Sequence, residues 1–365
     1  MTPTPYACPL HAARGVPEAA PEPPRRHRPS PRFGGVDSPV VSPSLLHQVV
    51  ATVLPRVRRA RDLDDADLER GRILAWQQTL VGGLPTRLVP GFSRRFDVEV
   101  DHSAGFPTYV LTPRGADVTR TVLYGHGGGY VKPIDAFHVR YVSILARRLG
   151  ARIVLPDYPL APTHTWRDSH EDLVDLAVAW AEHADCAGER PLTLMGDSAG
   201  GGLVLALAQT MRDRLRRHGS GAVAGSLVLH APWADLTSTA PGTEEFSARD
   251  PWLFLSKIRL YAEWWAGSPD DLDRPEVSPA LGDLSDLPPA LMLHGTRDTL
   301  AAACRMLVRR AEEAGGAHLR RGARPAARLQ PLPADPRGAA RDAPGAGLPR
   351  LSGRAGTGGR PMLAG

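Results

Sequence analysis

Short apolar runs alternate with amphipathic stretches through the middle of the chain. The runs that predict strands lie at 95–100, 107–112, 120–125, 151–156, 191–196, 225–230 and 289–294. Apolar residues with helical spacing occupy 134–149, 167–184, 199–218 and 300–314. Near-continuous apolar strands separated by amphipathic helices predict an α/β fold, with a mostly parallel sheet covered by helices on both faces. The segment DHSAG joins the first two strands and predicts an antiparallel hairpin at one edge.

The two ends of the chain lack this alternation. Residues 1–43 are rich in proline and arginine, contain no apolar stretch typical of a signal peptide, and are expected to be disordered. Residues 44–95 contain stretches with helical spacing, one interrupted by Pro55 and another at 65–80. The α/β domain is expected to begin at position 96 and to end at His318.

Charge and cysteine content exclude several classes of protein. The 365 residues carry a net charge of +5, but the positive excess lies in 1–43 and 319–365, and the stretch between them is acidic overall. An acidic core is not a surface for nucleic-acid backbones. No stretch approaches the ~20 apolar residues of a membrane span. The three cysteines show no metal-ligand spacing, so we expect no metal, no cofactor and a cytoplasmic location.

A glycine-flanked serine follows the strand predicted at 191–196. The sequence GDSAG at 196–200 fits the pattern G-x-S-x-G, in which a sharp turn between a strand and a helix exposes a nucleophilic serine, here Ser198. The glycines are needed because side chains at those positions would collide with the neighbouring strand and helix. The alternative is a glycine-rich turn that binds phosphate or merely links strand to helix.

Three successive glycines follow the strand predicted at 120–125. In HGGGY at 126–130 they leave backbone N–H groups unobstructed. Acyl transfer needs such donors where negative charge develops on the carbonyl oxygen. We expect the N–H groups of Gly127 and Gly128 to form this oxyanion hole together with that of Ala199. A phosphate-binding loop is the alternative, but the chain has neither G-x-G-x-x-G nor a P-loop lysine.

Five ordered motifs together resemble the hormone-sensitive-lipase-like family of α/β-hydrolase esterases. They are HGGGY at 126–130, DYPLAP at 157–162, GDSAGG at 196–201, APWADL at 231–236 and LMLHGTRD at 291–298. The resemblance extends from about Phe96 to Gly315 and implies an α/β-hydrolase domain at 96–318 that acts on short to medium acyl esters. It also implies a helical cap, for which residues 44–95 are candidates, and a lid insertion at about 240–275.

A serine esterase also needs a base for the serine proton and a carboxylate that orients the base. Asp298 stands where the resembled family keeps this acid, and a helix-capping role is compatible with that position. The family's histidine is expected after one more strand, close to position 328, where this chain has Arg328. His318 is the only histidine after Asp298 and so the only candidate, but it falls at the opening of the expected last strand and not in the loop after it. The triad histidine is therefore unassigned.

The composition of residues 319–365 offers a reason for the missing histidine. Arg, Ala, Gly and Pro dominate this stretch, and Val, Ile, Phe, Tyr, Trp, Lys and Glu do not occur in it. Such a composition is typical of disorder and predicts that the last strand and helix of the fold are missing. Two explanations stay open, a reading frame that slips near Gly316 and a natural disordered tail.

Two functional classes follow from these residues. The first is a carboxylic-ester hydrolase that works through an acyl-enzyme and is impaired by the absent histidine; amidase or formamidase chemistry would use the same groups. The second is a non-catalytic protein that binds a small ligand, as do plant gibberellin receptors, which resemble this family. The expected partner is a small-molecule ester, with no nucleic acid and no membrane span, and the oligomeric state is open.

Overall fold

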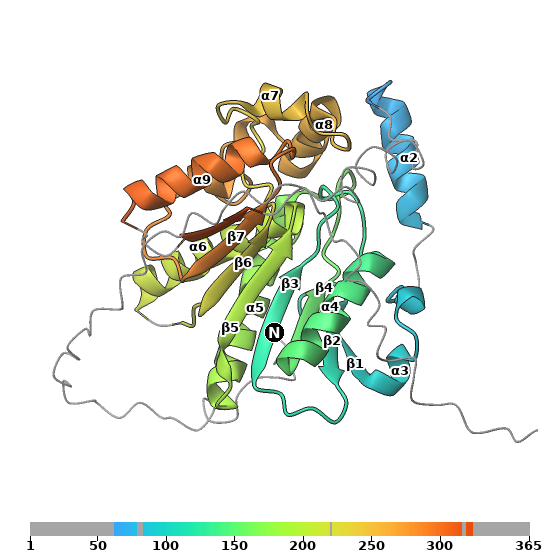
Figure 1. The fold of residues 1–365 in the computed structure, drawn as a ribbon, viewed down its shortest axis with the longest axis vertical. Helices are drawn as coiled ribbons and strands as arrows, with labels where there is room; N and C mark the ends of the chain where they lie inside the picture. Colours follow the sequence, from blue (N-terminus) through green and yellow to red (C-terminus); the bar gives the residue numbers. More distant parts are fainter. Residues whose placement is uncertain (1–61, 79–82, 220, 316–318, 324–365) are drawn as a thin grey trace, which may run out of the picture. The chain divides into compact units, whose positions relative to one another are not determined.

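A single sheet of eight strands organises the described part of the chain. The computed structural model describes residues 62–78, 83–219, 221–315 and 319–323. The strand order is β1-β2-β4-β3-β5-β6-β7-β8 (Figure 1). The strands are β1 Phe96–Asp101, β2 Thr108–Pro113, β3 Arg120–Gly125, β4 Ala151–Pro156, β5 Arg190–Asp197, β6 Ser226–His230, β7 Ala290–His294 and β8 Leu319–Ala323. β1 with β2 and β2 with β4 pair antiparallel, and all other neighbours are parallel, which confirms the predicted sheet and its edge hairpin.

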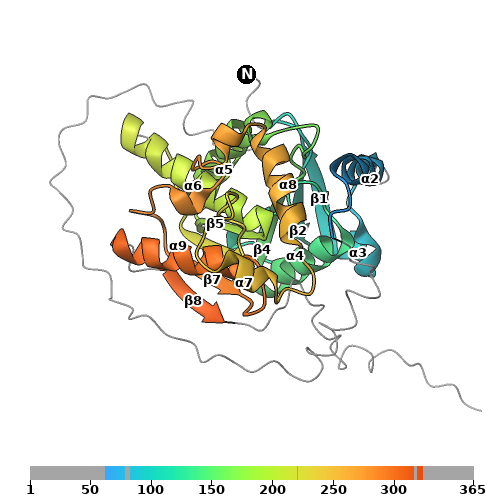
Figure 2. The same ribbon diagram turned by 90° about the horizontal axis from the view of Figure 1, so that it is seen from above.

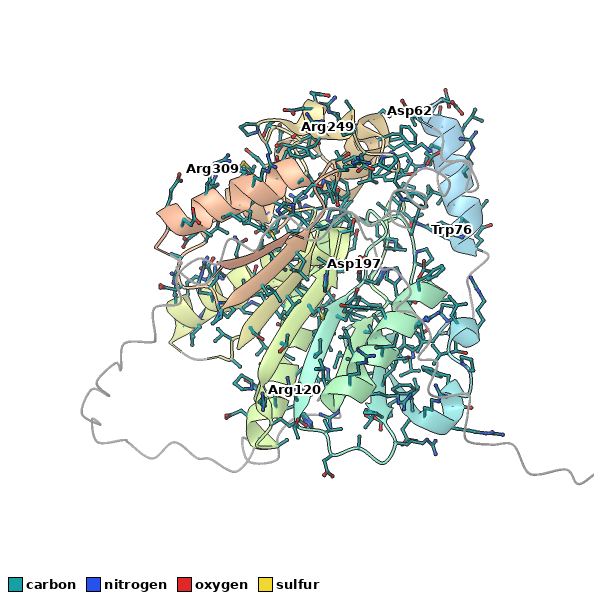
Figure 3. The ribbon with its side chains drawn as sticks, in the orientation of Figure 1. Asp62, Trp76, Arg120, Asp197, Arg249 and Arg309 are labelled. Atoms are coloured by element: carbon teal, nitrogen blue, oxygen red, sulfur yellow. The ribbon has the colours of Figure 1, made fainter. Side chains whose placement is uncertain are left out.

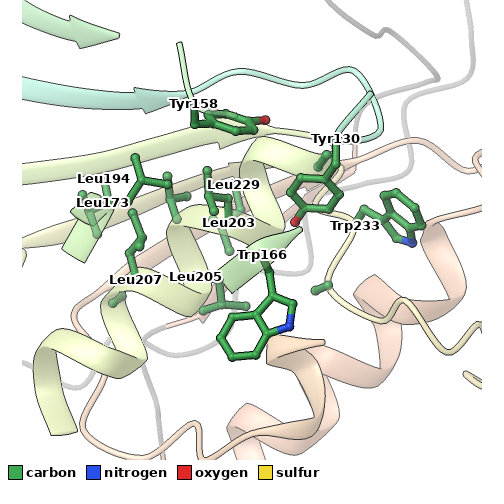
Figure 4. Close-up of a cluster of buried hydrophobic side chains, with 14 of the residues drawn as sticks. Tyr130, Tyr158, Trp166, Leu173, Leu194, Leu203, Leu205, Leu207, Leu229 and Trp233 are labelled. Carbon is green, nitrogen blue, oxygen red and sulfur yellow. The ribbon is translucent and has the colours of Figure 1, made fainter. Parts of the chain in front are cut away.

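Helices between the strands cover both faces of the sheet. They are α4 Ala136–Leu149, α5 His170–Cys186, α6 Ala199–His218 and α9 Ala301–Glu313. On one face, Val139 and Val142 of α4 pack with Ile153 in a buried cluster. On the other, α5, α6 and α9 contribute to a larger cluster that contains Leu173 and Leu203 (Figures 2 and 4). The carboxyl ends of the parallel strands meet at one edge, where ligand sites of such sheets lie.

Further helical elements lie before β1, between β4 and α5, and between β6 and β7. They are α2 Ala66–Gln78, η1 Thr86–Leu88 and α3 Phe92–Arg95 before the sheet, η2 Trp166–Asp168 before α5, and α7 Thr243–Ser247, α8 Leu255–Ala266, η3 Pro269–Asp271 and η4 Pro279–Leu281 before β7. The helical stretch predicted at 65–80 is confirmed as α2, whereas residues 1–61 lie outside the described part. None of the helices in the described ranges combines the length and apolar character that crossing a membrane requires.

The sheet has a strand, β8, where the sequence predicted that the last strand is missing. β8 pairs in parallel with β7 along its five residues, Leu319–Ala323. The prediction that no strand follows His318 is therefore wrong for this segment. Pairing uses backbone N–H and C=O groups, which every residue except proline supplies, so an edge strand needs fewer apolar side chains than a central strand. Residues 324–365 lie outside the described part of the chain.

Candidate active site

Ser198 lies in the turn between β5 and α6, at the carboxyl edge of the sheet. Its φ of 51° and ψ of −121° are unfavourable for a residue with a side chain. Backbone bonds hold it there, because its N–H donates to His230 O at 2.9 Å and its C=O accepts from Trp233 N–H at 2.8 Å. The loop after β6 therefore fixes both sides of the serine and maintains the strained conformation.

The glycines around Ser198 are required by close backbone contacts. A Cβ atom on Gly196 would lie 2.3 Å from Gly200 O, and a Cβ atom on Gly200 would lie 2.0 Å from Gly125 O. Real Cβ contacts are essentially never that short. The first turn of α6 therefore packs directly on the end of β3, which confirms the physical reason predicted for the two glycines.

Ala199 begins α6 and supplies a free donor next to the serine. As the first residue of the helix it has no intrahelical acceptor for its N–H. No other acceptor for this group is found among the described residues. The positive end of the helix dipole adds to its attraction for an anion. The N–H group of Ala199 is therefore available to an anion beside Ser198.

The glycine loop after β3 lies against the other side of the elbow. Gly127 N–H donates to Asp197 Oδ1 at 3.0 Å, and a Cβ atom on Gly127 would lie 2.3 Å from Asp197 Oδ2. The prediction that Gly127 donates to the oxyanion is therefore wrong, because its one N–H already has a carboxylate acceptor. The sequence could not reveal this acceptor, since the contact depends on how the loop packs on the elbow.

Gly128 and Gly129 remain as the donors of the loop. Their N–H groups have no acceptor within the described residues. Both have positive φ angles, 123° and 67°, which only glycine adopts without strain. A Cβ atom on Gly128 would also lie 2.7 Å from Lys132 O. Gly128 stays a predicted donor, and the N–H of Gly129, which the sequence prediction did not include, is equally without an acceptor among the described residues.

Asp298 lies at the same edge of the sheet, directly after β7. Its side chain is buried, and its Oδ1 accepts from Leu300 N–H at 2.9 Å in the turn that enters α9. Asp298 does not cap α9, because the helix begins at Ala301 with Leu300 as its N-cap residue and has no side-chain cap. The next residue, Thr299, donates from N–H and Oγ1 to Asp250 Oδ2 at 2.9 and 3.1 Å, which ties this turn to the segment before α8. Because β7 is two strands from β5 in the sheet order, Asp298 lies on the side of the elbow opposite the glycine loop.

The described residues place no triad histidine. His318 and Arg328 both lie outside them. His126 is buried beneath the glycine loop, with Nδ1 2.9 Å from Gly127 O and its ring stacked 4.4 Å from that of Tyr158. Burial lowers the pKa of His126 to about 4, so it is neutral at physiological pH. His126 therefore shapes the glycine loop.

Helices α2 and α8 flank the glycine loop. Gln77 of α2 donates from Nε2 to both Val131 O and Ala161 O at 2.8 Å. Glu69 of α2 accepts from the hydroxyl of Tyr261 on α8. A Cβ atom on Gly129 would lie 3.2 Å from the Tyr261 ring. Hydrogen bonds of Gln77 thus connect α2 to the segment directly after the glycine loop, at Val131, and to the loop after β4, at Ala161.

Among the described residues, no group of three or more His, Cys, Asp and Glu side chains could hold a metal ion. The site consists instead of a strained serine, a helix N-terminus and a glycine loop above a mostly parallel sheet. These features define an α/β hydrolase. A family model described as alpha/beta hydrolase fold matches residues 122–321. The chain belongs to this family, and within it to the hormone-sensitive-lipase-like group that its motifs resemble.

Sequence relatives and a solved structure agree with this family assignment. An acetyl-hydrolase of Streptomyces hygroscopicus is 34% identical over 196 residues, which cover 54% of this chain and 63% of the relative. An acetyl esterase of Salmonella paratyphi B is 27% identical over 213 residues, covering 54% and 64%. The chain thus spans less than two thirds of the length of these relatives. A solved esterase of the bacterial hormone-sensitive lipase family matches with a TM-score of 0.58 at 27% identity, covering 78% of this chain and 88% of that chain.

Proposed function

We propose that the protein is a serine carboxylic-ester hydrolase for esters with short acyl groups. One observation carries the proposal: Ser198 is held in a strained turn at the start of α6, next to a glycine loop with two amides that have no acceptor in the described part of the chain. This combination suits a carbonyl that becomes an oxyanion. The names of the acetyl-hydrolase and acetyl esterase relatives favour a small acyl group.

The proposed reaction proceeds through an acyl-enzyme. Ser198 Oγ attacks the ester carbonyl, and the resulting oxyanion accepts hydrogen bonds from the N–H groups of Gly128, Gly129 and Ala199. The alcohol leaves as the tetrahedral intermediate collapses, and water then releases the acid from the serine. In this scheme Asp298 orients a histidine that takes the proton from Oγ and returns it to the leaving alcohol.

We propose that this chain is impaired at the histidine step, because position 328 holds Arg328. The two faces of β7 are buried to different extents among the described residues. Met292 of β7 is buried on the face covered by α9, whereas Leu291, which points to the opposite face, is 39% exposed.

Translation of the gene in the two other frames downstream of Gly316 tests the explanation by a slipped reading frame. That explanation requires a β-rich stretch, a histidine and an amphipathic helix in one of them, and otherwise the natural tail stands.

The experiment that tests the function compares two serine variants. Ser198→Ala removes the proposed nucleophile, whereas Ser143→Ala removes a buried hydroxyl on α4 that has no hydrogen-bond partner among the described residues. Each protein is incubated with p-nitrophenyl acetate and, separately, with a fluorophosphonate probe. We expect slow turnover and labelling in the unmodified chain and in Ser143→Ala, and neither in Ser198→Ala. Loss of a triad member typically lowers kcat by ~10⁴–10⁶, so the turnover expected here is weak.

The assay also separates the alternatives. Turnover that survives in Ser198→Ala contradicts the proposal outright. Absence of both turnover and labelling in a folded chain that still binds ester analogues favours the non-catalytic ligand-binding protein. Preference for p-nitroacetanilide over the ester favours an amidase. The cytoplasmic location stays a prediction.

A further inference from the structure

A buried carboxylate connects the serine turn to the glycine loop. Asp197 directly precedes Ser198, and the pattern G-x-S-x-G places no demand on the residue at this position. Its Oδ1 accepts from Tyr124 Oη–H at 2.7 Å and from Gly127 N–H at 3.0 Å. Its Oδ2 lies 3.8 Å from Nε2 of His138. Three elements, β3, the glycine loop and α4, therefore converge on the side chain of Asp197. Figure 3 labels this residue.

The surroundings keep this carboxylate charged. A buried charge is unfavourable unless hydrogen bonds and opposite charge compensate it. Burial raises the pKa of Asp197, but the hydrogen bonds and charge of His138, together with the Tyr124 hydroxyl, lower it below its ordinary value overall. Asp197 is therefore an anion at the pH of an ester-hydrolysis assay, and it is a stronger acceptor for Gly127 N–H than a neutral group would be.

A second carboxylate, that of Asp135, also contacts the ring of His138. His138 lies in the first turn of α4, where Nδ1 accepts from the backbone N–H of the capping residue Asp135 at 3.0 Å and also lies 3.0 Å from Oδ1 of that residue. Burial lowers the pKa of His138, but hydrogen bonds and charge from Asp135 and Asp197 outweigh burial and raise it to about 10. The ring therefore lies between two carboxylates, Asp135 and Asp197. His138 is also buried, with only 7% of the residue exposed.

The peptide units on both sides of Gly127 are fixed. Its N–H is bound by Asp197, and its C=O is 2.9 Å from Nδ1 of His126. The preceding carbonyl, His126 O, accepts from the hydroxyl of Tyr158 at 2.8 Å. The chain therefore enters Gly128 in a defined direction. The two amides that have no acceptor in the described part of the chain follow immediately.

We propose that Asp197 is a positioning residue for the oxyanion hole. Supported by Tyr124 and His138, it anchors the peptide of Gly127 and so directs the following two amides towards a carbonyl at Ser198. The proposal rests on the proposed function, because it assigns these amides to an oxyanion. It explains why an acidic side chain stands beside a site that develops negative charge: the carboxylate acts through the loop, and His138 compensates its charge.

The size of the effect follows from the role of the donors. Removal of one oxyanion donor typically lowers kcat by ~10²–10³. Asp197→Ala leaves the donors in place but removes the acceptor that orients their loop, so we expect kcat to fall at least tenfold and KM to change little. Asp197→Asn keeps an acceptor oxygen for Gly127 and should retain more of the rate. Tyr124→Phe removes one support of Asp197 without altering a neighbour of Ser198, and a smaller decrease is expected.

A matched control is available at the amino edge of the sheet, opposite the edge that carries Ser198. Glu189, next to the first residue of β5, has a largely buried carboxylate that accepts from Thr121 Oγ1 at 2.7 Å and from an Arg152 nitrogen at 2.8 Å. Glu189→Ala removes a comparable buried acceptor at the amino edge of the sheet, away from the loop. This variant should lose stability without a selective loss of kcat.

The test combines kinetics with hydrogen exchange of the full chain. Deuterium uptake of peptides that cover 122–134 is measured by mass spectrometry, alongside kcat and KM for p-nitrophenyl acetate. We expect faster exchange at 127–131 in Asp197→Ala and Tyr124→Phe, little change in Asp197→Asn, and none in Glu189→Ala. The exchange readout does not depend on turnover, so a chain without esterase activity still tests whether Asp197 holds the loop.

Two results would overturn the proposal. The first is an Asp197→Ala variant whose deuterium exchange at 127–131 is as slow as in the unmodified chain. The second is faster exchange at 127–131 with an unchanged kcat, which would show that the loop needs no fixed position. If the unmodified chain has no turnover at all, the function proposed above fails, and the exchange data alone decide whether Asp197 orders the loop.

Discussion

The contact between α6 and β3 allows one substitution to be worked through in detail. Gly200→Ala places a Cβ atom 2.0 Å from Gly125 O and 2.6 Å from His126 O, where contacts under 3.0 Å essentially never occur. Both clashing atoms belong to the backbone, so no side-chain rotation relieves them. The first turn of α6 must move away from β3 by about 1 Å, and overpacking of this kind destabilises by ~1–3 kcal/mol. A misplacement of ~1 Å at a reacting group can lower the rate ~10²-fold.

Gly71→Ala is the matched control, because Gly71 also lies within a helix, α2, but a Cβ atom there would have no neighbour within 4 Å. It should stabilise the protein by ~0.5–1 kcal/mol. Urea unfolding gives the free energy of unfolding of each variant, and the rate of fluorophosphonate labelling reports on Ser198. We expect lower stability and slower labelling in Gly200→Ala only. A Gly200→Ala protein as stable and as rapidly labelled as the unmodified chain would refute the packing argument.

Three further predictions concern the surroundings of the site. Gln77→Ala removes two hydrogen bonds to loop carbonyls and should lower the free energy of unfolding by ~1–3 kcal/mol, measured by urea unfolding; an unchanged midpoint contradicts the anchoring of α2. The pKa of His138, about 10, is raised above the ordinary value of 6.5, so its contribution to stability is fully present below about pH 6.5 and is lost as the pH rises through 10. Urea midpoints at pH 7 and 10 should therefore differ more in the unmodified chain than in His138→Gln, and equal differences would exclude this role. Leu291→Thr on the exposed face should reduce binding of the dye ANS with less than ~1 kcal/mol change in stability, whereas a large loss would show that this face is covered.

The sheet could be predicted from the sequence because each strand and helix is specified by the pattern of its own neighbouring residues. Apolar runs of strand length, separated by amphipathic helices, leave few arrangements other than a parallel sheet. The tight turn at Ser198 could be predicted as well, because the spacing of Gly196 and Gly200 indicates positions where a side chain would not fit. The strand Leu319–Ala323 was missed, because composition reports on side chains whereas edge pairing depends on the backbone.

Details of the candidate site depended on contacts that no local pattern encodes. Which glycines keep free amides is decided by Asp197, whose carboxylate binds Gly127 only once the loop and the elbow are packed together. His138 likewise gains its role from the approach of α4 to the elbow. The contacts of Gln77 with the loop join residues 54 and 84 positions apart, which spacing rules cannot connect.

The central claim is that three amides face a carbonyl bound to Ser198. A crystal structure of the protein after reaction with a small fluorophosphonate tests it most directly, because the phosphonyl oxygen occupies the place of the oxyanion. We expect phosphorus on Ser198 Oγ and one oxygen within 2.7–3.1 Å of the N–H groups of Gly128, Gly129 and Ala199. An oxygen that points away from these amides, or a Gly127 that has exchanged Asp197 for the phosphonyl group, would contradict the account.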